Sequence, residues 1–270
     1  MITDFSTYSP LALALLGTGF TFLGTALGAA IVFVFKGKVN EEFQRIFLGF
    51  AAGIMIAASV FSLLLPAINM AASQGQISWV PAAFGFITGV VFLLILDNLL
   101  PHMHFGSNSP EGLHSKLKRS TMLVFAITLH NIPEGMAVGL TFGLANFERG
   151  VSAPLAAAFA LALGIGLQNI PEGAAVSLPL KGEGFSNWKA FVYGALSGLV
   201  EPIAAVISVL LIGHIASMMP WFLAFAAGAM LYVVVEELIP DAKLGEHSHA
   251  GTISVLVGFV LMMVLDVAFG

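Results

Sequence analysis

The chain has no cysteine and very little charge. Without cysteine it can form neither a disulfide nor a thiolate metal site. Only 9% of its 270 residues are charged, whereas a typical soluble domain has about 25%. Hydrophobic residues make up 58% of the chain, and its mean hydropathy is +0.97. This composition indicates an integral membrane protein. Because no polar insert has the size of a soluble domain, we predict one transmembrane domain over residues 1–270.

Eight stretches are long and apolar enough to cross a bilayer, which takes roughly 20 residues of helix. Short polar connections separate them. The sequence therefore predicts an all-α integral membrane protein with eight transmembrane helices. Their expected bounds are Leu11–Phe35, Ile46–Ala71, Val80–Leu100, Ser120–Leu144, Ser152–Leu180, Trp188–Ile215, Pro220–Ile239 and Thr252–Phe269.

The basic residues predict how the chain is oriented, because cytoplasmic loops carry an excess of Lys and Arg. If the N-terminus lies outside, only Arg149 of the ten basic residues falls outside. Both termini are then extracytoplasmic, and we expect a multi-pass protein of the cell (inner or plasma) membrane. The basic residues on the cytoplasmic side are Lys36, Lys38, Arg45, Lys116, Lys118, Arg119, Lys181, Lys189 and Lys243.

A nine-residue motif occurs twice with seven identities, as FLGFAAGIM at Phe47–Met55 and as FLAFAAGAM at Phe222–Met230. A proline segment follows each copy, LLLPA in one case and ELIPDA in the other. Helices rich in Gly and Ala resemble one another, since small residues are common at packing faces. The shared proline nevertheless favours an inverted repeat. Three helices would lie on each side of a central pair, as in many secondary transporters.

A polar hexapeptide also occurs twice inside apolar segments: HNIPEG begins at His130 and QNIPEG at Gln168. Residues four apart share one face of a helix. His130 should therefore point the same way as Glu134, and Gln168 the same way as Glu172. Each copy also has an asparagine three residues before its glutamate, Asn131 in one case and Asn169 in the other.

Each of three consecutive segments places a proline next to a glutamate. Pro133 and Pro171 lie inside the hexapeptides, and Pro202 directly follows Glu201. Because a proline donates no backbone hydrogen bond, each helix should kink and leave a carbonyl oxygen beside its carboxylate. Such backbone groups are tolerated at membrane depth where they are buried in protein or line a polar cavity. We expect the three segments to build one polar site in mid-membrane.

These intramembrane glutamates need a counter-charge. A charged side chain at the bilayer centre costs about 2.5–3.5 kcal/mol on insertion scales, and the middles of these segments contain no Lys or Arg. The carboxylates must be protonated or compensated by a cation. A single intramembrane Asn or Gln usually serves a helix–helix hydrogen bond. Carboxylate, imidazole and amide groups together, without a thiolate, suit Zn²⁺, Fe²⁺ or Mn²⁺ better than Cu⁺.

The segments HNIPEGMAVGL and QNIPEGAAVSL resemble the paired signature of the ZIP (Zrt/Irt-like) family of divalent metal transporters, in particular its bacterial GufA-like branch. Eight helices, external termini and a histidine-bearing connection between the third and fourth segments also resemble that family. The resemblance implies transport of divalent transition-metal cations into the cytoplasm, with zinc first and Fe, Mn, Cd and Co as further candidates. It implies no enzymatic activity and no prosthetic group, because the metal is the substrate.

The resemblance also implies a 3+2+3 helix order and an elevator-like movement of one helix bundle against another. The expected partners are divalent metal ions, the lipid bilayer and a second copy of the chain in a homodimer. No nucleic acid is expected.

By the same resemblance, the metal centre is binuclear, and the two hexapeptide glutamates bridge the metals. Met55 is an additional candidate at the first position. That position would use His130, Glu134, Gln168 and Glu172. The second would use Asn131, Glu134, Asn169, Glu172 and Glu201. A cytoplasmic release route would include Asp97, His102, His104 and Glu237.

Two positions depart from the family pattern. Many members have His where this chain has Gln168, and Asp where it has Asn169. Two amides lower the charge and ligand strength of both metal positions. The preferred metal and the occupancy of the second position therefore stay open.

Two other functions are left as alternatives. A proton or monovalent-cation carrier would use the intramembrane glutamates alone, but His130 beside amide groups argues against it. An intramembrane metalloprotease needs zinc ligands and a general base, typically in an H-E-x-x-H motif. That motif does not occur in the sequence.

Overall fold

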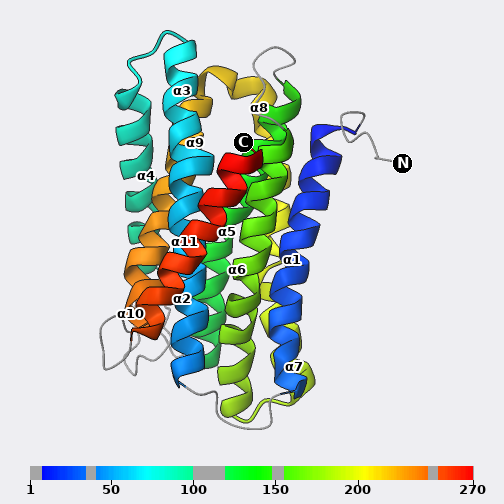
Figure 1. Cartoon of the computed structure of the whole chain (residues 1–270). Coiled ribbons are helices and arrows are strands. Elements are labelled where there is room, and N and C mark those ends of the chain that lie inside the picture. The colour runs from blue at the N-terminus through cyan, green and yellow to red at the C-terminus, as the bar shows by residue number, and fades with distance from the viewer. Residues whose placement is uncertain (1–7, 35–40, 100–118, 148–154, 243–248, 270) are drawn as a thin grey trace.

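The structure, a computed structural model, describes residues 8–34, 41–99, 119–147, 155–242 and 249–269. Every regular element within these ranges is a helix, and the long helices run side by side in one bundle (Figure 1). The predicted all-α class is confirmed. The elements are α1 (Pro10–Val34), α2 (Glu41–Ala57), η2 (Ala58–Leu64), α3 (Leu65–Ser73), α4 (Trp79–Leu99), α5 (Arg119–Phe147), α6 (Leu155–Gly182), α7 (Asn187–Ser197), α8 (Val200–Ile215), η3 (Ala216–Met218), α9 (Met219–Val233), η4 (Val234–Leu238), α10 (Ile239–Asp241) and α11 (Ala250–Phe269).

Seven helical runs among the described residues are long and apolar enough to cross a membrane. They coincide with seven of the eight predicted segments. The remaining segment, Ser120–Leu144, lies within α5, a helix of 29 residues that packs against α1, α6, α8 and α9. The number of eight crossings stays a prediction. Helix α1 begins and α11 ends at the same end of the bundle (Figure 1).

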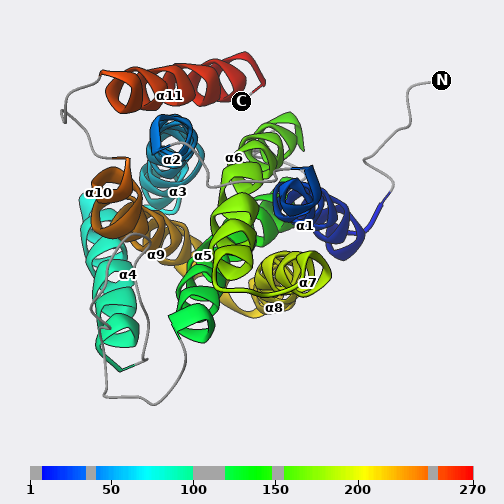
Figure 2. The same ribbon diagram turned by 90° about the horizontal axis from the view of Figure 1, so that it is seen from below.

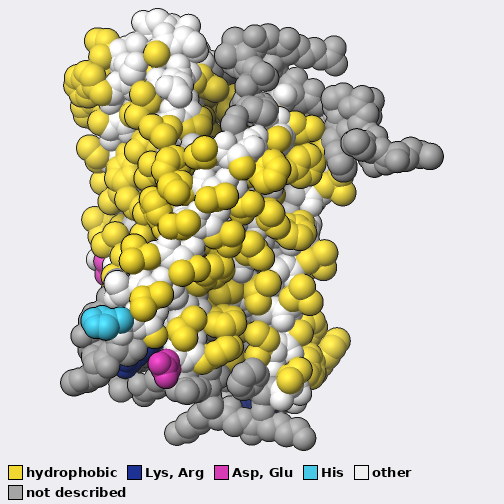
Figure 3. Space-filling model, viewed as in Figure 1, with side chains coloured by type: hydrophobic (Ala, Val, Ile, Leu, Met, Phe, Trp, Pro, Cys, Tyr) yellow, Lys and Arg dark blue, Asp and Glu magenta, His cyan; other side chains and the backbone are white. Residues whose placement is uncertain are grey.

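The outer surface of the bundle is apolar. Hydrophobic side chains cover most of the described face in Figure 3, and the His and charged side chains in view lie mainly toward its lower end. Helix α11, for example, exposes large aliphatic side chains along its length. A contiguous apolar surface of this extent is rare on soluble monomers, but around a membrane-spanning bundle it faces lipid. The exposed side chains on α11 include Ile253, Leu256, Val257, Val260, Val264 and Val267.

Two runs contain a π-helix, whose backbone hydrogen bonds span five residues. Element η2 joins α2 to α3, and η4 joins α9 to α10. Each begins a few residues after one copy of the nine-residue motif. Pro66 follows the first π-helix and Pro240 the second. The two runs with matching sequence therefore share the same irregularity at the same place.

The three prolines beside glutamates behave differently from one another. Helices α5 and α6 continue through Pro133 and Pro171 without interruption. The third run is broken at residues 198–199, between α7 and α8, and Pro202 lies in the first turn of α8. A missing backbone N–H costs little in a first turn. The kink expected at Pro202 is therefore replaced by a break just before it.

The helices form two groups. Helices α1, α5, α6, α7 and α8 make the first group, in which α1 packs along α6 and α5 along α8. The second group contains α2, η2, α3, α4, α9, η4, α10 and α11, with α2 packed along α11 and α4 along α9. Seen along the bundle, the groups lie next to each other and meet where α5 and α6 face α9 and α2 (Figure 2).

Glycines bring the paired helices of the second group into backbone contact. A Cβ on Gly89 of α4 would lie 2.1 Å from the Phe225 carbonyl oxygen of α9. A Cβ on Gly258 of α11 would lie 2.2 Å from the Phe50 carbonyl oxygen of α2. Phe50 and Phe225 occupy the same position in the two copies of the nine-residue motif. The two pairs are therefore built alike.

This packing predicts that Gly89→Ala destabilises the protein by about 1–3 kcal/mol, as overpacking of a tight interface does. The matched control is Gly19→Ala in α1, where an added Cβ meets nothing within 4 Å. Alanine favours a helix over glycine, so the control should be as stable as the parent or slightly more so. Thermal unfolding of both variants in the same detergent measures the difference. Equal melting temperatures would contradict the close contact between α4 and α9.

Candidate metal centre

All seven predicted ligands from the hexapeptides and the third glutamate segment are buried inside the first helix group. The exposed fraction of each of these residues is between 0% and 6%. Three helices supply them. Helix α5 carries His130, Asn131 and Glu134, helix α6 carries Gln168, Asn169 and Glu172, and helix α8 carries Glu201.

The predicted ligands on α5 contact residues of α6, of η4 and of α7. Glu134 Oε1 accepts a hydrogen bond from Gln168 Nε2 at 2.5 Å, which links α5 to α6. His130 Nδ1 lies 2.9 Å from Glu237 Oε2 on η4, which links α5 to the second helix group. Asn131 Nδ2 donates to the Ser197 carbonyl oxygen at 3.0 Å. Asn131 thereby binds the last residue of α7, next to the break in that run.

The two amides on α6 connect to each other and to Glu201. Gln168 Nε2 lies 3.0 Å from Asn169 Oδ1. Asn169 Nδ2 donates to Glu201 Oε1 at 2.9 Å and to the Thr21 carbonyl oxygen at 3.1 Å. Two hydroxyl groups of α1, from Thr21 and Thr25, also donate to the Glu201 carboxylate. Each oxygen of Glu201 therefore has a donor.

Four buried oxygen atoms of the centre have no hydrogen-bond partner. They belong to residues of α5 and α6, and each is an acceptor that would normally be paired when buried. The hexapeptide glutamates and Glu201 also lie close enough to repel one another electrostatically. Unpaired oxygens and like charges both favour a cation between these helices. The four atoms are Asn131 Oδ1, Glu134 Oε2, Gln168 Oε1 and Glu172 Oε2.

Within the described residues, no three His, Asp or Glu side chains converge at metal-binding distance. The carboxylates contact amide and hydroxyl donors instead of sharing one centre: Glu134 contacts Gln168, and Glu201 contacts Asn169 and Thr21. The two departures from the family pattern, Gln168 and Asn169, supply the amide groups in these contacts.

The other predicted residues are more scattered. Met55 is fully buried in the hydrophobic core. Asp97, near the end of α4, accepts a hydrogen bond from the Tyr232 hydroxyl, and Glu237 lies nearby on η4. His102 and His104 lie outside the described residues.

The contacts that α1 makes with the centre were not predicted from the sequence. Thr18, Thr21 and Thr25 are fully buried, three and four residues apart on one face of that helix. The spacing of hydroxyl residues within an apolar segment was the available signal. Threonine is common in membrane helices, so the spacing alone does not reveal which carboxylate it contacts.

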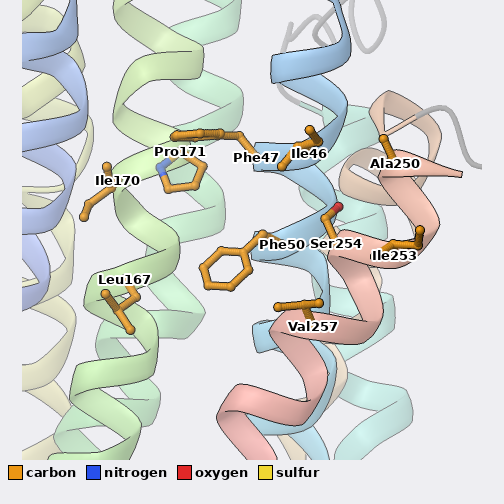
Figure 4. Close-up of a pocket in the computed structure, with 10 residues that line it drawn as sticks. All are labelled: Ile46, Phe47, Phe50, Leu167, Ile170, Pro171, Ala250, Ile253, Ser254 and Val257. Carbon is orange, nitrogen blue, oxygen red and sulfur yellow. The ribbon is translucent and has the colours of Figure 1, made fainter. Parts of the chain in front are cut away.

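A groove lies on the other side of α6 and is not part of the centre. Its volume is about 550 Å³, and apolar side chains of α2, α6 and α11 surround it (Figure 4). Ser254 is its one hydroxyl, and that group donates to the Gly251 carbonyl oxygen of its own helix at 2.8 Å. A divalent cation would find no ligands there.

Comparison with known proteins shows the family to which the chain belongs. The family model described as ZIP Zinc transporter matches residues 102–266. The chain is 38% identical to zinc transporter ZIP11 of Homo sapiens over 95% of this chain and 97% of the relative. It is 37% identical to zinc transporter GufA of Myxococcus xanthus, with 91% and 94% covered. It is also 37% identical to zinc transporter ZIPB of Bordetella bronchiseptica, with 95% and 81% covered.

The matches extend over nearly the whole of this chain and of these relatives, so the shared feature is the complete helical domain and not a local motif. They confirm the resemblance drawn from the paired hexapeptides. They also confirm that the function is transport and not enzymatic. The chain belongs to the ZIP family of zinc transporters and is similar to its GufA-like branch.

Proposed function

We propose that this protein carries divalent transition-metal cations, zinc foremost, across the cell membrane into the cytoplasm. The observation that carries the proposal is the set of four unpartnered oxygens on α5 and α6, buried among three carboxylates. Zinc, iron and manganese accept oxygen and imidazole ligands of this kind. A cation there would satisfy the acceptors and remove the repulsion between the glutamates.

The first metal position would use His130, Glu134, Gln168 and Glu172. The contact between His130 Nδ1 and Glu237 Oε2 supports this role, because a metal-binding histidine usually donates its other ring N–H to a carboxylate or carbonyl group. Nε2 is then the ring nitrogen that faces the metal. Glu237 both orients the imidazole and connects it to the second helix group.

The second metal position would add Asn131, Asn169 and Glu201 to the shared glutamates. Asn131 Oδ1 is one of the unpartnered oxygens, whereas Asn169 and Glu201 bind each other. A cation at this position must compete with that hydrogen bond. We therefore expect weaker binding there than at the first position, which suits a pathway that must also release its cargo.

The release route is proposed to lead from His130 toward the ends of α4 and η4. Glu237 contacts His130, and it lies with Glu236 and Asp97 around the Tyr232 hydroxyl. These elements end at the lower end of the bundle in Figure 1. The distribution of basic residues supports a cytoplasmic position for that end. His102 and His104 would extend the same route.

An inverted repeat of three, two and three helices is supported by the features that the first three and the last three predicted helices share. The π-helices η2 and η4 follow the two copies of the nine-residue motif, and the α2·α11 and α4·α9 pairs use the same glycine contact. The division into two helix groups supports movement of one group against the other. Eight crossings, external termini and a homodimer remain proposals on the strength of the family resemblance.

The proposal predicts different effects for the three glutamates. Glu134→Ala and Glu172→Ala each remove a ligand of both metal positions. Even substitution of a residue that only hydrogen-bonds to a metal ligand commonly costs about 10–100-fold, so zinc uptake should fall by at least that factor. Glu201→Ala should lower the number of metals bound from two toward one and leave measurable uptake. Purified protein in liposomes, with zinc and other divalent cations supplied outside, gives both quantities.

The matched control for this series is Asp266→Ala. Asp266 is also a half-buried intramembrane carboxylate, but its partner is Ser62 at 2.5 Å, away from the seven ligands. Its loss should leave metal stoichiometry unchanged. If Glu134→Ala transports like the parent while Glu201→Ala is inactive, the shared-carboxylate centre is wrong. Uptake of protons or sodium without any divalent metal would favour the monovalent-cation carrier instead.

Zinc binding should weaken as the pH is lowered from about 7.5 to about 5.5, because carboxylate and imidazole ligands must lose their protons to bind a metal. The sign follows from competition: protons and metal ions occupy the same atoms. Isothermal titration of the purified protein with zinc at several pH values measures the effect. An affinity independent of pH over this interval would exclude an imidazole–carboxylate site.

A further inference from the structure

Helix α1 contributes no charged side chain and no histidine to the first helix group, yet it contacts the metal centre. Its three threonines are fully buried and lie on one face. Of these, Thr21 makes the closest contact with a predicted ligand. The Thr21 hydroxyl donates a short hydrogen bond to Glu201 Oε2.

The neighbouring threonines differ from Thr21 in their contacts, because neither of them donates to Glu201 Oε2. A helical threonine commonly bonds to a carbonyl oxygen one turn back, and the Thr18 hydroxyl does so, at 2.7 Å from the Ala14 carbonyl oxygen. The Thr25 hydroxyl lies 3.4 Å from Glu201 Oε1 and 3.5 Å from the Thr21 carbonyl oxygen, so both of its contacts are long. The Thr21 hydroxyl is 3.1 Å from the Thr18 carbonyl oxygen and closer still to Glu201.

Thr21 also contacts the second partner of Glu201. Its carbonyl oxygen accepts a hydrogen bond from Asn169 Nδ2 at 3.1 Å, and the same amide donates to Glu201 Oε1 at 2.9 Å. One residue of α1 therefore touches α6 through its backbone and α8 through its side chain. The Glu201 carboxylate is held at one oxygen by Thr21 and at the other by Asn169.

Two glycines, one in α1 and one in the break between α7 and α8, permit this approach. A Cβ on Gly24 would lie 2.3 Å from the Gly166 carbonyl oxygen and 3.3 Å from Asn169 Cβ. At the break before α8, a Cβ on Gly198 would lie 2.8 Å from Thr25 Oγ1. Any larger side chain at these positions would separate α1 from α6 or from α8. The close packing thus serves to place the Thr21 hydroxyl beside Glu201.

A carboxylate has about four acceptor positions on its two oxygens. On Glu201, the Thr21 hydroxyl occupies a position on Oε2, and Asn169 and the more distant Thr25 hydroxyl both lie at Oε1, so a position on Oε2 is left for a cation. A hydrogen bond to a carboxylate is stronger than one between neutral groups, so it holds the side chain in one orientation. Hydrogen-bond partners of metal ligands commonly contribute 10–100-fold to metal affinity or activity.

We propose that Thr21 is a positioning residue whose hydroxyl holds the Glu201 carboxylate in the geometry that binds the second cation. Helix α1 is then the fourth helix that lines the metal centre, beside α5, α6 and α8. This inference rests on the proposed function, because it assigns Glu201 to a metal position. It identifies the residue that decides whether one or two divalent cations are bound. Thr21 itself is not assigned as a ligand.

The test compares hydroxyl-free and hydroxyl-retaining variants by isothermal titration with zinc and by zinc uptake into liposomes. Thr21→Val keeps the shape of the side chain and should weaken the second binding step by about 10–100-fold, with the first step unchanged. Thr21→Ser keeps the hydroxyl and should bind two metals as the parent does. Thr25→Val should have a smaller effect because its contacts are longer. Thr18→Val is the matched control and should behave like the parent.

A double-mutant cycle with Glu201→Gln separates positioning from general packing. If Thr21 acts through Glu201, Thr21→Val should change nothing further in the Glu201→Gln background, whereas independent effects would add. Thr21→Ala is the second hydroxyl-free variant, to be used if valine prevents folding as judged by size-exclusion chromatography. Additive effects, or a Thr21→Ser variant as impaired as Thr21→Val, would overturn the proposal.

The outcome also distinguishes this inference from the proposed function. A parent protein that neither binds nor transports any divalent metal would refute the function and this inference with it. If the parent transports zinc and binds two metals, and Thr21→Val binds and transports zinc as well as Thr18→Val does, only the role of Thr21 is refuted.

Discussion

A carboxylate between membrane-spanning helices must find hydrogen-bond donors or a cation inside the protein, because neither lipid nor bulk water reaches it there. This protein places three such groups, Glu134, Glu172 and Glu201, on adjacent helices. The basic residues in the described helices of the first group, Arg119, Lys181 and Lys189, belong to the end regions of α5, α6 and α7. In the interior these carboxylates are therefore stabilised by amide and hydroxyl donors and, under the proposed function, by the transported ion.

The packing of the first helix group follows from that requirement. Amides on α6 and hydroxyls on α1 reach carboxylates on α5 and α8 only if the helix axes approach closely, and glycines make this approach possible. The contact of the centre with the second group is different in kind. It runs through the His130–Glu237 pair, two polar side chains that can exchange partners. Strong backbone contacts within each group and an exchangeable contact between the groups suit a transporter whose two halves move against each other.

Much of this arrangement was predictable from the sequence. The paired hexapeptides predicted a group of polar residues that α5 and α6 bury together, and hydropathy located the long helical runs of the described residues, because both signals depend on residues close together in the chain. The role of Thr21 could not be predicted, since Glu201 is 180 positions away and threonine has no strong preference for one partner. The π-helices and the break before α8 depend on tertiary packing more than on local propensity. Proline marked the right regions but did not reveal which helix would be interrupted.

The break between α7 and α8 has an electrostatic consequence for the ion. It creates a new helix N-terminus in mid-bundle, with Glu201 in the first turn. The aligned peptide dipoles of α8 place the equivalent of about half a positive charge at that end. Part of the negative charge of Glu201 is thus already offset by the backbone, so the carboxylate attracts a divalent ion less strongly than one in the middle of a helix. Under the proposed function, an ion bound at Glu201 would therefore be held less tightly and would leave more readily.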